Sequence, residues 1–177
     1  ELPHTWNARD GQDGGNDYWR GCCTYCTRFA APVYDPAQQQ VWLQFEGVNA
    51  SAAVLLNGQQ LCTHDGGYST FRAEVTELLQ AENQLTVRVD NSVNDRVYPQ
   101  KADFTFYGGI YRDVSLLVVN KNHIALGHFG DTGVKITPAQ QENSADIRVE
   151  TLVEGEGTVA VELLDAEVRA EHAHRGA

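Results

Sequence analysis

The feature that most constrains the fold is a pair of short segments joined by the dipeptide Asn57-Gly58. Residues 53–56 precede this dipeptide and residues 59–62 follow it. A two-residue turn of type I′ needs a positive φ at both central positions, and Asn followed by Gly provides it at low cost. These residues therefore predict an antiparallel β-hairpin.

Period-two alternation of apolar and polar residues predicts further strands. It runs over residues 41–46 and 85–90, as in strands with one buried face. Residues 114–119 are almost continuously apolar, which predicts a strand buried on both faces. Only residues 75–79 indicate a helical turn, with Thr76 as its cap. Three more alternating strands are expected at residues 134–137, 147–153 and 158–164.

Many short strands with almost no helix predict an all-β fold, an antiparallel β-sandwich of jelly-roll type. Residues 1–29 are expected to be mostly loop, and the glycine-rich stretch 10–17 lacks the Lys-Ser/Thr ending of a phosphate cradle. Residues 120–128 separate the strands predicted before them from the three strands predicted after them. The charged tail, residues 165–177, is expected to be frayed.

Four cysteines raise the question of a metal or redox site. Cys23 and Cys26 have Cys-x-x-Cys spacing. If residues 22–29 form a strand, however, these two side chains point to opposite faces and cannot bind one ion together. We therefore expect ordinary thiols, no metal and no cofactor, and reduced cysteines would fit a cytosolic protein.

Composition excludes some partners. The net charge is −11, so the phosphates of nucleic acid would be repelled. No apolar run is long enough to span a bilayer, so we expect a soluble protein, cytoplasmic or secreted, without a membrane partner. The chain lacks methionine and starts at Glu1, from which we expect a piece of something longer.

An acid followed by aromatic residues and a glycine pair gives a first indication of function. The stretch Asp103–Val114 contains Phe104, Phe106, Tyr107 and Tyr111. Aromatic rings stack on the apolar face of a sugar while a carboxylate accepts its hydroxyl groups. The alternative is that the rings belong to the core and the glycines to a turn.

An ordered series of motifs resembles the amino-terminal sugar-binding domain of family-two glycoside hydrolases. The resemblance covers residues 2 to about 119, and within the family it is most similar to bacterial β-galactosidases, while β-glucuronidases and β-mannosidases share the scaffold. The motifs are Leu2–Asn7, Asp10–Tyr18, Phe45–Asn49, Val54–Gly58, His64–Phe71, Glu82–Leu85 and Phe106–Val114.

The resemblance implies two domains: a jelly-roll sugar-binding domain over residues 1–120, and an incomplete immunoglobulin-like sandwich over residues 121–177 that begins near Gly127–Pro138. It also implies a parent enzyme that is a retaining glycosidase with two glutamates on a catalytic barrel. That barrel is not in this sequence, so no catalytic residue is assigned. Glu74 with Glu77, and Glu154 with Glu156, are expected to be solvated charges.

Three residues are candidates for substrate binding. Asp103 matches a family aspartate that binds sugar hydroxyls, and the alternative for it is an Asx turn. Tyr18 follows the glycine-rich loop, in a region that approaches the sugar in relatives. Asn91 ends a strand and is equally compatible with a turn.

These observations leave three hypotheses. The chain is an accessory part of a β-galactosidase-type enzyme, with a β-linked galactoside and the remaining domains as partners. Alternatively, it is a free-standing carbohydrate-binding module or a protein-interaction sandwich. The oligomeric state is left open: the resemblance implies a parent family that often assembles into homo-oligomers through these sandwiches, whereas the strand edges of an incomplete second domain would invite artificial pairing.

Overall fold

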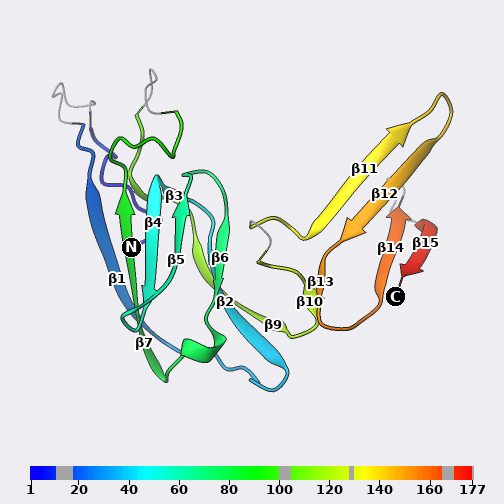
Figure 1. Ribbon diagram of the computed structural model, residues 1–177, viewed down its shortest axis with the longest axis horizontal. Helices are drawn as coiled ribbons and strands as arrows, with labels where there is room; N and C mark the ends of the chain where they lie inside the picture. The colour runs from blue at the N-terminus through cyan, green and yellow to red at the C-terminus, as the bar shows by residue number, and fades with distance from the viewer. Residues whose placement is uncertain (11–17, 100–104, 128–129, 165–169, 177) are drawn as a thin grey trace. The chain divides into compact units, whose positions relative to one another are not determined.

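In the computed structural model the chain forms two compact units, Glu1–Val118 and Val119–Ala177. The structure describes residues 1–10, 18–99, 105–127, 130–164 and 170–176. Over these residues the protein is nearly all β, and the strand pairs with a resolved register are antiparallel (Figure 1). The predicted β-sandwich class is therefore confirmed, whereas the boundary between residues 120 and 121 and the immunoglobulin-like identity of the second part stay predictions.

Two sheets and a small strand pair make up the first unit. One sheet has the order β1-β7-β4-β5 and the other the order β6-β2-β9, while β3 pairs with β8. The elements are β1 (Cys22–Ala30), β2 (Gln39–Phe45), β3 (Val48–Asn49), β4 (Ser51–Leu56), β5 (Gln59–Asp65), β6 (Phe71–Glu74), the 3-10 helix η1 (Thr76–Leu78), β7 (Glu82–Asp90), β8 (Gly109–Ile110) and β9 (Val114–Asn120).

The core of the first unit lies between its two sheets. Phe45 of β2 is fully buried, and its ring stacks on that of Phe71 with centroids 4.8 Å apart. The inward residues of β4 and β7 complete the core, as period-two alternation requires. Trp42, expected on the polar face of β2, is also buried, so this strand is covered on both faces near its middle.

The predicted hairpin is confirmed. β4 and β5 pair across Asn57 and Gly58, whose φ values are +52° and +83°. The Asn57 side chain also donates to the carbonyl of Leu78 and to Oδ1 of Asn83. The turn is thereby tied to the start of β7 and to the helical turn.

Four other expectations need correction. Thr76 is not a side-chain cap: it is the first residue of η1, and its Oγ1 accepts a hydrogen bond from Val41 N and donates one to Glu74. β9 is only half-buried, because its position at the edge of a three-stranded sheet leaves one side uncovered. Residues 22–30 form a nine-residue strand rather than loop. The tail contains a strand at Ala170–Gly176, where a frayed end was expected.

The second unit consists of strand pairs. β10 pairs with β13, β11 with β12, and β14 with β15. The three predicted strands are present, and the bounds are β10 (His123–Ile124), β11 (Val134–Gln140), β12 (Ala145–Thr151), β13 (Val153–Glu154), β14 (Val159–Leu164) and β15 (Ala170–Gly176).

Candidate functional site

The candidate site is the end of the first unit at which β7 stops and β1 and β4 begin. The register places Cys22 beside Asp90 and Asp90 beside Ser51, so these strand ends are neighbours. Three connections meet there: the segment before β1, the turn after β5, and the long connection from β7 to β8. Figure 1 shows this end at the top of the unit.

Two buried asparagines join these connections. Asn91 is fully buried; its Oδ1 accepts from Gly21 N at 2.8 Å, and its Nδ2 donates to Phe106 O at 3.1 Å. The same Nδ2 lies 3.2 Å from Oδ1 of Asn7, which is also fully buried. Because a buried amide left without partners costs about 1–3 kcal/mol, this network holds the segments in one arrangement.

Asn7 extends the network in both directions. Its Oδ1 accepts from Gly108 N at 2.8 Å, and its Nδ2 donates to Asp10 Oδ2 at 2.6 Å and to Trp19 O at 2.7 Å. The Trp6 ring packs edge-on against the Trp19 ring. We call Asn7 and Asn91, with the backbone groups they bind, the asparagine framework.

Glycine is required at position 108 of this framework. A Cβ there would overlap the ring of Trp6 and approach the amide of Asn91. At Gly109 the φ of +136° is itself unfavourable for other residues. The glycine pair therefore permits close approach of backbone to side chains, and the interpretation as a simple turn is incomplete.

The three predicted site residues differ in what the structure shows. Tyr18 donates a hydrogen bond from its hydroxyl to Phe106 O at 2.7 Å, and burial raises the pKa of this phenol. Asn91 points into the framework and is completely covered by protein groups. Asp103 lies outside the described residues. A sugar-binding role for each of these residues stays a prediction.

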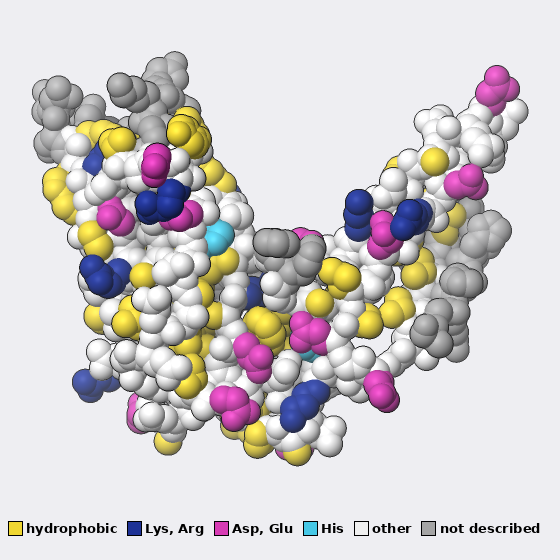
Figure 2. Space-filling view, in the orientation of Figure 1, with side chains coloured by type: hydrophobic (Ala, Val, Ile, Leu, Met, Phe, Trp, Pro, Cys, Tyr) yellow, Lys and Arg dark blue, Asp and Glu magenta, His cyan; other side chains and the backbone are white. Residues whose placement is uncertain are grey.

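Exposed aromatic rings gather at this end, and of these the sequence pattern indicated Tyr107 but not Tyr68 or Tyr98 as a contact for sugar. Trp19, Tyr68, Tyr98 and Tyr107 are 40–73% exposed, and all four belong to the three connections at this end. Their signal in the sequence is weak, because alternation indicates burial only inside strands. Figure 2 shows hydrophobic side chains exposed at this end of the unit.

Two buttressing contacts fix the neighbourhood of Tyr68. The hydroxyl of Tyr111 donates to Gly67 O, and burial raises the pKa of Tyr111. The guanidinium of Arg112 donates to the carbonyls of Glu46 and Tyr68, and it also lies over the Tyr111 ring. The turn that presents Tyr68 is thus tied to the strand pair β3–β8.

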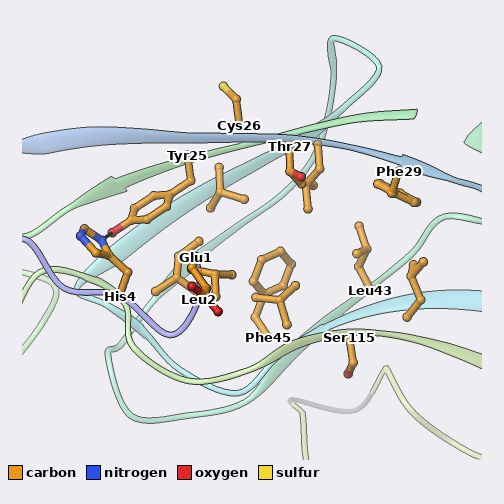
Figure 3. A pocket seen from close by; sticks show the side chains of 15 residues that line it. Glu1, Leu2, His4, Tyr25, Cys26, Thr27, Phe29, Leu43, Phe45 and Ser115 are labelled. Carbon is orange, nitrogen blue, oxygen red and sulfur yellow. Dashed lines mark hydrogen bonds between the residues drawn. The ribbon is translucent and has the colours of Figure 1, made fainter. Parts of the chain in front are cut away.

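A pocket separate from the candidate site lies between the sheets of the first unit. Its volume is about 630 Å³, and β1 and β7 line one wall while β2 and β9 line the other. Figure 3 shows the rings of Tyr25, Phe29 and Phe45 around it, together with His4, whose Nδ1 is 2.8 Å from the Tyr25 hydroxyl. The lining is mostly apolar, so it offers few hydrogen-bond partners to the hydroxyl groups of a sugar.

The described part of the chain also shows where the potential metal ligands and the acids considered as pairs lie. No group of three or more His, Cys, Asp or Glu side chains converges there as metal ligands. Glu74 accepts from the hydroxyl of Thr76, while Glu77 is exposed. No helix among the described residues is long and apolar enough to cross a membrane.

The first unit is a β-sandwich that presents aromatic residues on loops beside the asparagine framework, an architecture that carbohydrate-binding domains share with domains of other functions. A family model described as "Glycosyl hydrolase 2 galactose-binding domain-like" matches residues 16–139. The chain therefore belongs to this family, the galactose-binding-like domain of family-two glycosyl hydrolases.

The names of the relatives that match this chain refer to two enzyme activities. A β-glucuronidase of Bacteroides fragilis is 38% identical over 76% of this chain. A β-galactosidase of Thermoanaerobacter pseudethanolicus is 30% identical over 73% of it. The chain spans only about a fifth of these proteins, 19% and 18% of their lengths.

Solved structures agree with the fold. The crystal structure of an FMN-binding β-glucuronidase from Facaelibacterium prausnitzii L2-6 has a TM-score of 0.90 and 35% identity, covering 98% of this chain and 28% of its own. A putative β-galactosidase from Bacteroides fragilis has a TM-score of 0.85 and 34% identity, covering 99% of this chain and 28% of its own.

Proposed function

We propose that this chain is a non-catalytic amino-terminal part of a retaining glycoside hydrolase that acts on terminal β-glycosides, and that its loops contribute to sugar binding. Membership of the family supports the enzyme class. The observation that carries the loop role is the asparagine framework, which fixes Phe106, three residues after Asp103, at an end where aromatic rings are exposed. Rigid elements that hold adaptable contact residues are typical of binding sites.

We propose the substrate of the parent enzyme first as a broad class of glycosides and then as a particular sugar. The coarser proposal is a β-linked glycoside of the galactoside or glucuronide type, since relatives of both names match the chain. The finer proposal from the sequence, a galactoside, competes with the glucuronide. Hydrolysis of chromogenic β-galactosides and β-glucuronides by the parent enzyme decides between them.

Asp103 is proposed to accept hydrogen bonds from sugar hydroxyls. An ionised carboxylate forms charge-assisted bonds about twice as strong as neutral ones. In the parent enzyme, we expect Asp103→Asn to raise KM or lower kcat without changing thermal unfolding. Asp95→Asn, an exposed aspartate of the same connection, is the matched control. Unchanged kinetics for Asp103→Asn would remove it from the site.

The alternative of a free-standing binding module rests on the exposed rings. Calorimetric titration of the chain with galactose and with glucuronic acid tests it. We expect negligible binding for an accessory part, because the rest of the pocket belongs to other domains. Binding at millimolar concentration or tighter would favour the module and contradict the accessory role.

A further inference from the structure

Strand β1 is an open edge of its sheet. In the order β1-β7-β4-β5 it has one neighbour among the described residues. Asn91 N donates to Gly21 O just before the strand, and Ala31 N donates to Ala81 O just after it. Because backbone groups alternate along a strand, odd-numbered residues face β7 and even-numbered residues turn their N–H and C=O groups outward.

Within its own nine residues, this edge carries little of the protection that edge strands usually have. Its nine residues contain no proline and one charge, Arg28. The opposite edge of the same sheet, β5, has a register irregularity in its pairing with β4, and its Asp65 forms an ion pair with Arg96. Figure 2 shows hydrophobic side chains along the margin of the unit where β1 lies.

The cysteines of β1 give the edge a self-complementary pattern. Cys22 and Cys26 are both exposed, and with Thr24 between them they share one face of the strand. Figure 3 shows Cys26 directed away from the pocket, whereas Tyr25 lies on the pocket side. Two copies of β1 paired antiparallel about Thr24 would place Cys22 of each opposite Cys26 of the other.

We propose that β1 is a self-association surface, on which two copies of this chain pair their edges antiparallel with Thr24 at the two-fold axis. Thr24 and both cysteines have outward backbone groups, so they occupy hydrogen-bonded positions of the new ladder, where opposite Cα atoms are about 5.5 Å apart. That separation lies within the range that a disulfide can bridge. Pairing also extends the sheet that forms one wall of the apolar pocket.

The pairing allows two intermolecular disulfides. Each disulfide forms between Cys22 of one copy and the partner's Cys26, whose thiols together lose two protons and two electrons. A small disulfide such as oxidised glutathione accepts them and is reduced to two thiols. Cys23 and Cys62 are partly buried, and burial raises the pKa of both thiols, so they react more slowly. The net charge of −11 opposes association, so salt should strengthen it.

Sedimentation velocity and oxidative trapping of the full chain test the proposal. We expect a dimer fraction that rises with protein concentration and with salt under reducing conditions. With oxidised glutathione we expect a covalent dimer whose peptide map shows a Cys22–Cys26 link. That link should be lost in Cys22→Ser and in Cys26→Ser, and kept in the matched control Cys62→Ser.

Two substitutions at Thr24 separate edge pairing from other association. Thr24→Pro removes an outward N–H that the isolated sheet does not use, so the fold is kept while the dimer weakens about tenfold or more. Thr24→Lys brings two charges together at the axis and serves if the proline variant misfolds. A chain that stays monomeric, a dimer indifferent to both variants, or links through Cys23 or Cys62 would each overturn the proposal.

Discussion

The two units use the same kind of strand but differ in what the strands enclose. In the first unit, two sheets face each other and bury Phe45, Val54 and Val89 almost completely. In the second, the described strands pair in twos, and Ile136, Ile147 and Leu164 remain 46–64% exposed. Strand pairing alone therefore does not make a core, because an isolated pair has no second apolar face to pack against.

The largest expected difference between the units comes from truncating a buried ring. We expect Phe45→Ala to lower the free energy of unfolding of the first unit by about 3–5 kcal/mol, since both transfer energy and packing are lost. Ile147→Ala, at an exposed position of β12, should cost less than about 0.5 kcal/mol.

Urea unfolding measures both variants. Fluorescence reports the first unit, because all three tryptophans, Trp6, Trp19 and Trp42, lie there, and far-ultraviolet circular dichroism follows the whole chain. Similar losses for Phe45→Ala and Ile147→Ala would contradict the contrast between the units.

A smaller loss is expected when the asparagine framework is cut. Asn91→Ala removes the acceptor of Gly21 N and one of the two donors to the Phe106 carbonyl, which Tyr18 also binds, and should cost about 1–3 kcal/mol. Asn143→Ala, an exposed asparagine of the second unit, is the control and should be neutral. If both variants unfolded at the same urea concentration, the framework would not be a source of stability.

Two glycines, Gly58 in the first unit and Gly157 in the second, separate the effect of backbone conformation on stability from that of space for a side chain. Gly58 and Gly157 both have open space where a Cβ would lie, but only Gly58 has a positive φ, +83°. We therefore expect Gly58→Ala to cost about 1 kcal/mol and Gly157→Ala almost nothing. Thermal unfolding measures both, and an equal shift would show that φ is not the cause.

The smallest expected effect is a pH dependence confined to the first unit. Burial lowers the pKa of His64, whose ring stacks on Phe71, below the ordinary 6.5. The unfolded chain therefore binds the proton more readily, so stability is full above pH 6.5 and falls as the pH is lowered toward the folded pKa. His64→Phe should flatten this slope in urea titrations between pH 5 and 7.5; an unchanged slope would assign it to other groups.

The sequence predicted well those features that local patterns encode. The Asn57-Gly58 hairpin and the alternating strands follow from backbone preferences and side-chain periodicity, both of which act over a few residues. The half-buried state of β9 could not be predicted in this way. Burial of a strand depends on its neighbours in the sheet, and β9 lies at an edge.

The features of the candidate site can likewise be divided into those that the sequence determines and those that only the tertiary structure decides. The residues of this chain determined by themselves its all-β class, its acidic surface and the glycine pair at residues 108 and 109. Only the tertiary structure decided that Asn7 and Asn91, 84 positions apart, meet in the interior, and that the strand with Cys22 and Cys26 is at the edge of its sheet among the residues that the structure describes. Contacts between distant segments depend on how sheets stack, and no short stretch of sequence contains that information.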